Sequence, residues 1–145
     1  MTNKNALRTA LMAAAALWQM SSLAADAQQP VSKAIVQPLM EKDLEGVAGK
    51  ELLMLTVKYL PGGASLPHRH DAQVCVYVLQ GELTMQVEGS PPVTLRRGQT
   101  FYENRTDVHV VSANASKTAP AKILVFIVKD KNAPVSRDAA VKEAP

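Results

Sequence analysis

Between Glu51 and Lys129 the chain is a succession of short apolar runs, each bounded by residues that favour turns. The runs are rich in valine, leucine and isoleucine, and the turns contain glycine, proline, asparagine or aspartate. None of the runs has the length and the 3.6-residue period of an amphipathic helix. Many short strands joined by close turns are typical of a sandwich or barrel, so the sequence predicts one all-β domain.

The runs place the expected strands at residues 51–60, 73–80, 82–88, 93–95, 99–103, 110–112 and 121–129. Residues 28–50 contain two prolines and two glycines, and they are expected to form an N-terminal arm. Within it we expect a short edge strand at 34–36 and one helical turn at 39–44. Residues 130–145 are polar and rich in alanine, so they are expected to be a loose C-terminal tail.

Composition limits the partners that the chain can have. The formal net charge is only +3, and the basic residues are scattered without interleaved aromatic residues. This pattern gives no footprint for the phosphate backbone of a nucleic acid, so no nucleic-acid partner is expected. Aromatic residues make up 4% of the chain, so the core is expected to be mainly aliphatic.

Residues 1–27 have the features of a secretory signal peptide. Lys4 and Arg8 precede an apolar run at 10–17, and small residues then allow cleavage after Ala24 or Ala27. The alternative is an uncleaved anchor, but the run is short for a membrane span. The sequence therefore predicts a periplasmic or secreted bacterial protein without a stable membrane anchor.

Cys75 is the only cysteine, so no disulfide can form within one chain. It lies in an apolar run, which predicts a small buried hydrophobic side chain. A disulfide between two chains is the alternative.

The three histidines of the chain are arranged as a metal-binding set would require. His68 and His70 are one residue apart on an extended segment, so their side chains point to the same side. His109 follows a second glycine-led stretch, GQTFYENRTDVH. Imidazole is a good ligand for most divalent transition metals, so these three side chains could converge on one ion.

The first histidine segment, GGASLPHRHDAQVCVYVLQG, resembles the first motif of the cupins. That motif has a glycine, five residues, His-x-His, three or four residues, glutamate, six residues and glycine. Gly62, His68, His70 and Gly81 fit this spacing. The glutamate position falls on Val74, which cannot bind a metal.

The second stretch resembles the second cupin motif. Gly98 and His109 fit it, and Asn114 comes one residue later than usual. Asn104 and Thr106 replace the usual proline and glycine. Over residues 51–129 the resemblance implies a single cupin jelly-roll β-barrel. It also implies that His68, His70 and His109 point into the barrel and bind one divalent ion, with iron, manganese, zinc, nickel and copper all open.

Glu103 is the best substitute for the missing glutamate. It stands beside Phe101 and Tyr102 on the segment that leads to His109, and burial of an unpaired carboxylate there would be costly. It is therefore the candidate fourth metal ligand and catalytic residue, unless it faces solvent or pairs with Arg105. Gln73 is a weaker candidate, because strand alternation puts it on the opposite face from residue 74.

The resemblance implies two classes of function. One is a metal-dependent enzyme of the dioxygenase, isomerase or lyase type, acting on a small oxygenated compound. The other is a non-catalytic module that binds a small molecule or a metal, including a cupin that has lost its metal. The resemblance implies a homodimer in either case.

Overall fold

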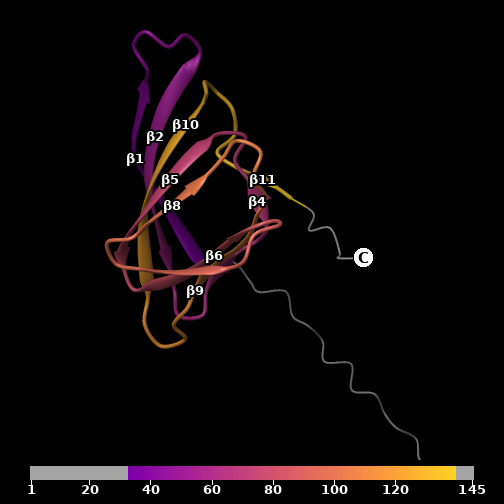
Figure 1. The fold of residues 1–145 in the computed structure, drawn as a ribbon. Helices are drawn as coiled ribbons and strands as arrows, with labels where there is room; N and C mark the ends of the chain where they lie inside the picture. The colour runs from indigo at the N-terminus through magenta and orange to yellow at the C-terminus, as the bar shows by residue number, and fades with distance from the viewer. Residues whose placement is uncertain (1–32, 140–145) are drawn as a thin grey trace, which may run out of the picture.

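The structure is a computed structural model that describes residues 33–139, and all regular structure in this range is strand (Figure 1). In chain order the strands are β1 (Ala34–Asp43), β2 (Lys50–Tyr59), β3 (Ala64–Ser65), β4 (His68–Arg69), β5 (Gln73–Gln80), β6 (Glu82–Val87), β7 (Val93–Arg96), β8 (Thr100–Glu103), β9 (His109–Asn114), β10 (Ala121–Asp130) and β11 (Arg137–Asp138). Over residues 33–139 no helix is long and apolar enough to cross a membrane. The prediction of an all-β fold is confirmed.

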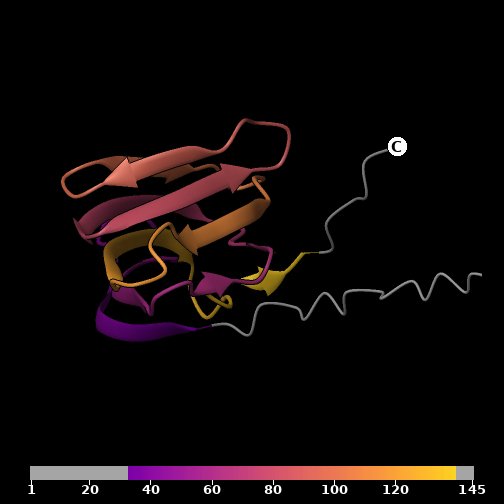
Figure 2. The same ribbon diagram turned by 90° about the horizontal axis from the view of Figure 1, so that it is seen from below.

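The strands form two antiparallel sheets, which are the two layers of the molecule (Figures 1 and 2). The first sheet has the order β1-β2-β10-β5-β8, and the second has the order β11-β4-β9-β6-β7 with β3 beside β9. Strands distant in sequence are neighbours, since β10 pairs with both β2 and β5. This is the topology of a single-domain jelly-roll barrel, as predicted.

The core lies between the sheets and is mainly aliphatic. On β2, β5 and β10 every second residue faces inward, so Leu53, Val74 and Ile127 are buried while their chain neighbours are more exposed. From the second sheet Leu83 and Met85 of β6 are fully buried. The side chain of Asn114 closes one end of the barrel by donating to the carbonyl oxygens of Leu60 and Ala119 at 3.1 and 2.8 Å.

The arm differs from the expectation. β1 extends over ten residues and pairs with β2 along its length, so the prediction of a helical turn at 39–44 is wrong. Proline is tolerated because β1 is an edge strand, and the register shifts between Pro38 and Met40. Val36 of this strand faces the space between the two sheets, where it lines a cavity that is described below.

The C-terminal segment is not wholly loose within the described residues. β11 pairs with β4, with Arg137 opposite Arg69 and Asp138 opposite His68. The amide of Ala139 donates to the carbonyl oxygen of Pro67 at 3.1 Å. The segment expected to be a loose tail therefore lies against β4, the strand that carries His68 and directly precedes His70.

Cys75 is also placed differently from the expectation. Its neighbours Val74 and Val76 are buried, so Cys75 points to the outer face of the first sheet and is exposed. The prediction of a buried cysteine is wrong, because the continuous apolar run of β5 hides its inward and outward alternation.

Candidate metal centre

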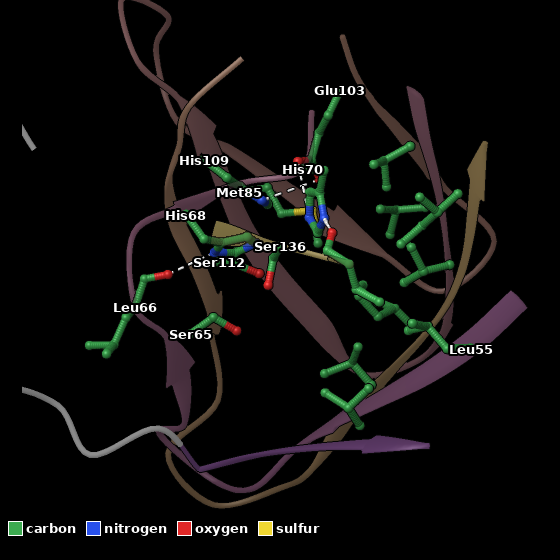
Figure 3. Close-up of a pocket in the computed structure, with 18 of the residues that line it drawn as sticks. Leu55, Ser65, Leu66, His68, His70, Met85, Glu103, His109, Ser112 and Ser136 are labelled. Carbon is green, nitrogen blue, oxygen red and sulfur yellow. Dashed lines mark hydrogen bonds and ion pairs between the residues drawn. The ribbon is translucent and has the colours of Figure 1, made fainter. Parts of the chain in front are cut away.

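A cavity of about 240 Å³ lies between the two sheets, and the three histidines gather on one of its walls (Figure 3). The first sheet supplies an apolar wall, with Leu55, Val57, Val125 and Ile127 among its residues. The second sheet supplies polar side chains from β3, β4 and β9. A cavity of this size suits a small ligand.

Strand register brings the histidines together. His68 of β4 pairs directly with His109 of β9, and their ring centroids are 5.2 Å apart. The ring centroid of His70 is 4.9 Å from that of His68. All three rings line the cavity, which is the arrangement that the sequence predicted for them.

Glu103 lies inside the barrel next to these rings. It pairs in register with Val74, and only 3% of the residue is exposed. Its Oε1 is 3.2 Å from Nδ1 of His109, and its Oε2 is 3.7 Å from Nε2 of His70. The sequence left two alternatives for Glu103, namely exposure to solvent and pairing with Arg105. Neither holds, because Glu103 is buried and Arg105 contacts Asp130 instead at 2.8 Å.

The electrostatics keep Glu103 ionised and His68 neutral. Burial by itself would raise the pKa of Glu103, but the contact with His109 and the electrostatic influence of the neighbouring imidazoles outweigh it, and the pKa lies below its ordinary value. Burial lowers the pKa of His68, although its bond to Leu66 opposes this. A carboxylate and a neutral imidazole are the forms that bind a metal ion.

Two backbone carbonyls orient the ligand candidates of the His-x-His pair. Nδ1 of His68 is 2.7 Å from the carbonyl oxygen of Leu66, and Nδ1 of His70 is 2.7 Å from that of Val135. A carbonyl oxygen only accepts, so each Nδ1 carries a hydrogen, and in the neutral ring Nε2 then keeps its lone pair. Such bonds are the usual support of metal-binding histidines.

His109 is the least satisfied polar side chain in this cluster. It is 2% exposed, and neither of its ring nitrogens has an aligned hydrogen-bond partner. Buried polar atoms without a partner are rare, because desolvation is not compensated. A metal ion would supply the missing partner, so the donor set fits a transition metal. Within residues 33–139 no group of three His, Cys, Asp or Glu side chains is already arranged to hold a metal ion.

Val74, at the glutamate position of the first motif, and its neighbour Gln73 lie on opposite faces of β5. Val74 is fully buried and lines the cavity, but it offers no ligand atom. Gln73 is exposed and does not line the cavity. Gln73 is therefore not brought to the cluster, as its place on the opposite face of the strand implies.

Tyr59 could be expected as a pocket residue from the sequence, but Ser65, Ser112, Ser136 and Asp138 of the cavity were missed. The hydroxyl of Tyr59 lies 2.7 Å from Ser112 Oγ and 3.1 Å from Ser65 Oγ. Burial raises the pKa of Tyr59, so this hydroxyl stays protonated. Ser136 and Asp138 line the cavity from the C-terminal segment. Their positions depend on pairings that leave no local signal in the sequence.

The fold and the paired histidine motifs define a cupin barrel. The family profile of the cupin domain matches residues 55–127, which includes all four residues of the cluster. The chain therefore belongs to the cupin family. No curated protein matches it significantly.

Solved structures resemble the chain over most of the barrel. A recombinant oxalate oxidase in complex with glycolate has 26% identity and a TM-score of 0.58, and the match covers 77% of this chain and 57% of that one. TT1209 from Thermus thermophilus has 25% identity and a TM-score of 0.53, with coverage of 66% and 82%. The DMSP lyase DddQ from Ruegeria pomeroyi has 21% identity and a TM-score of 0.60, with coverage of 88% and 60%, and shows the fold alone. This chain spans about half the length of the oxalate oxidase chains, with coverage of 52% to 57%.

Proposed function

We propose that the chain is an exported cupin that binds one divalent metal ion and acts on a small oxygenated compound. The ion would be held by His68, His70, His109 and Glu103. The observation that carries the proposal is His109, a buried imidazole whose ring nitrogens have no aligned hydrogen-bond partner and which lies beside an ionised carboxylate and two oriented imidazoles. Export is supported by the signal-peptide pattern of residues 1–27, which lie outside the described residues.

The chain's own groups divide into those that hold the ion and those that face the ligand. Bound in this cavity, a divalent ion would supply Lewis-acid or redox chemistry. Glu103 would belong to both groups, because it is the ionised carboxylate inside the cavity and therefore also the candidate to take up a proton there. The apolar wall excludes water from the ligand, and the hydroxyls of Tyr59 and Ser112 can orient it.

The reaction class that receives most support is oxidation of a small oxygenated acid. The similarity to oxalate oxidase in complex with glycolate, at 26% to 27% identity, supports it, as does the small cavity. Among the described residues that line the cavity none is a lysine or an arginine. A carboxylate substrate would therefore depend on the metal ion for its charge partner.

Metal analysis tests the proposal and separates it from a binding module. The full chain, purified without a histidine tag, is expected to contain about one equivalent of a transition metal. It is also expected to show turnover of oxalate or glycolate with that metal. Metal without turnover of either acid would favour the non-catalytic module, and no metal even after reconstitution would contradict both forms of the proposal.

Glu103→Gln is expected to weaken metal binding about 10- to 100-fold. The change keeps the size of the side chain but removes the charge that lies beside His109 and His70. The dissociation constant can be measured by competition with a chelator. Asp107→Asn, which neutralises a carboxylate outside the cavity, is the matched control. Equal affinity in Glu103→Gln and the wild type would remove Glu103 from the site.

We propose further that the protein is a homodimer and that two copies meet through the outer face of the first sheet. An uncharged row crosses all five strands in register, from Met40 through Met54, Phe126 and Cys75 to Tyr102. Tyr102 is 49% exposed and Phe126 is 36% exposed. A contiguous row of exposed apolar side chains favours an interface, and a row without charge is complementary to a second copy of itself.

Phe126→Arg is expected to convert the dimer to a monomer. The arginine would place a charge at the centre of the row on each copy, without a partner across the interface. Sedimentation velocity measures the change. Val47→Arg, at an exposed position in the turn between β1 and β2, is the control and should remain a dimer. A monomeric wild type would contradict the proposal.

A further inference from the structure

The residues of the C-terminal segment, 133–139, contact the histidine cluster at several points. The carbonyl oxygen of Val135 accepts the hydrogen bond from Nδ1 of His70. Asp138 pairs in register with His68, and Val135, Ser136 and Asp138 all line the cavity. This segment therefore supplies both a support for one ligand candidate and part of the cavity wall.

Further contacts hold the segment in place. Nε of Arg137 lies 3.1 Å from Oδ2 of Asp71, and Nε of Arg69 lies 3.4 Å from Oδ1 of the same carboxylate. Asp71 has a φ of 48°, a left-handed conformation that is uncommon for a residue other than glycine. Asp71 directly follows His70 in the chain. The contact of Arg137 with Asp71 therefore connects the C-terminal segment to the residue next to His70.

The two histidines of the His-x-His pair are supported in different ways. His68 bonds to Leu66, two residues earlier in the same loop, so its support is local. His70 bonds to Val135, 65 residues later in the chain. Of the two, His70 alone depends on the C-terminal segment for the hydrogen-bond acceptor that keeps its Nε2 free.

We propose that residues 133–139 are a positioning strap for His70, which they hold with Nε2 free for the metal ion. The inference rests on the proposed metal site. The strap acts through His70, and its exposed residues are held mainly by pairing with β4 and by the Arg137–Asp71 contact. Release of the strap would leave the Nδ1 hydrogen of His70 without its acceptor.

Truncation tests the strap. A chain that ends at Pro134 lacks Val135 but keeps Ala133, whose carbonyl oxygen accepts a hydrogen bond from Lys129. It is expected to bind Zn²⁺ about 10- to 100-fold more weakly than the full chain, because the support of a metal-binding histidine is worth about that much. A chain that ends at Ala139 keeps the strap and is the control. Equal affinity of the two truncated chains for Zn²⁺ would overturn the proposal.

A measurement without metal separates the strap from the metal site. Long-range ¹H–¹⁵N correlation spectra at about pH 8, where histidine is neutral, report which ring nitrogen carries the hydrogen. In the metal-free full chain both His68 and His70 are expected to carry it on Nδ1. In the chain that ends at Pro134 only His70 should lose this tautomer. An unchanged His70 would overturn the strap, whether or not the full chain binds metal.

A full-length variant covers the case in which the shorter chain does not fold. Arg137→Glu puts a like charge beside Asp71, and it is expected to shift the tautomer of His70 and to weaken Zn²⁺ binding. Arg137→Lys keeps the charge and should behave as the wild type. If Arg137→Glu leaves both the His70 tautomer and the Zn²⁺ affinity unchanged, the strap does not position His70.

Discussion

His109→Ala is expected to weaken metal binding by more than about 100-fold and to leave a folded β protein. His109 is the ligand candidate whose ring nitrogens have no other aligned partner, so the metal ion is the interaction that its removal takes away. The groups that support metal ligands are worth about 10- to 100-fold, and a ligand itself is expected to be worth more. The measurement is metal content after dialysis, with circular dichroism as the test of folding.

Metal-induced stabilisation gives a second readout of the same change. A ligand that binds only the folded state adds about 2.7 kcal/mol when its concentration is roughly 100 times its dissociation constant. Thermal unfolding of the wild type should therefore shift upward with added metal, and that of His109→Ala should not. Gln73→Ala is the matched control, since Gln73 is exposed outside the cavity. Stoichiometric metal in His109→Ala would contradict the proposed site.

The strands of the barrel could be predicted because each is an apolar run bounded by residues that favour turns. In β10 the residues Ile123, Val125 and Ile127 face inward, and each is separated from the next by a residue of the other face. The sequence predicted the strand, but its continuous apolar run did not show which side is buried. β1 was predicted only in part, because Pro38 indicates a break, whereas an edge strand accommodates proline at a change of register.

The histidine cluster could be predicted from spacing, but its support could not. His68, His70 and His109 stand in two motifs whose order and spacing are visible in the chain. The contact of His70 with Val135 joins residues 65 positions apart, next to a strand of two residues. A strand that short has no recognisable pattern, so the polar composition of this segment predicts a tail instead.

The largest effect on stability is expected at a pair of charges that the sequence alone does not join. Glu51 of β2 and Lys129 of β10 stand opposite each other in register, and they are 2% and 5% exposed. Lys129 donates to the carboxylate of Glu51 and to the carbonyl oxygen of Ala133. In the sequence Glu51 and Lys129 stand at the ends of two expected strands, where charged residues are usually exposed to solvent. The sequence does not show that these two strands are neighbours, so it does not predict the buried pair.

Glu51→Gln and Lys129→Met are each expected to lower the free energy of unfolding by about 3–5 kcal/mol. Either change leaves one charge buried without its counterion, and the desolvation of that charge is then uncompensated. Urea unfolding of each variant measures the loss. Lys58→Met, which removes an exposed lysine from the same strand as Glu51, is the control and should change stability by less than about 0.5 kcal/mol.

The double variant Glu51→Leu/Lys129→Met separates the worth of the pair from the cost of breaking it. Replacement of both charges by apolar side chains removes the desolvation cost of each, so the double variant should be more stable than either single variant. Its loss should be well below the sum of the two single losses, which is the signature of residues in direct contact. Additive losses would mean that the two charges act independently, and that Ala133 or water already satisfies Lys129 without Glu51.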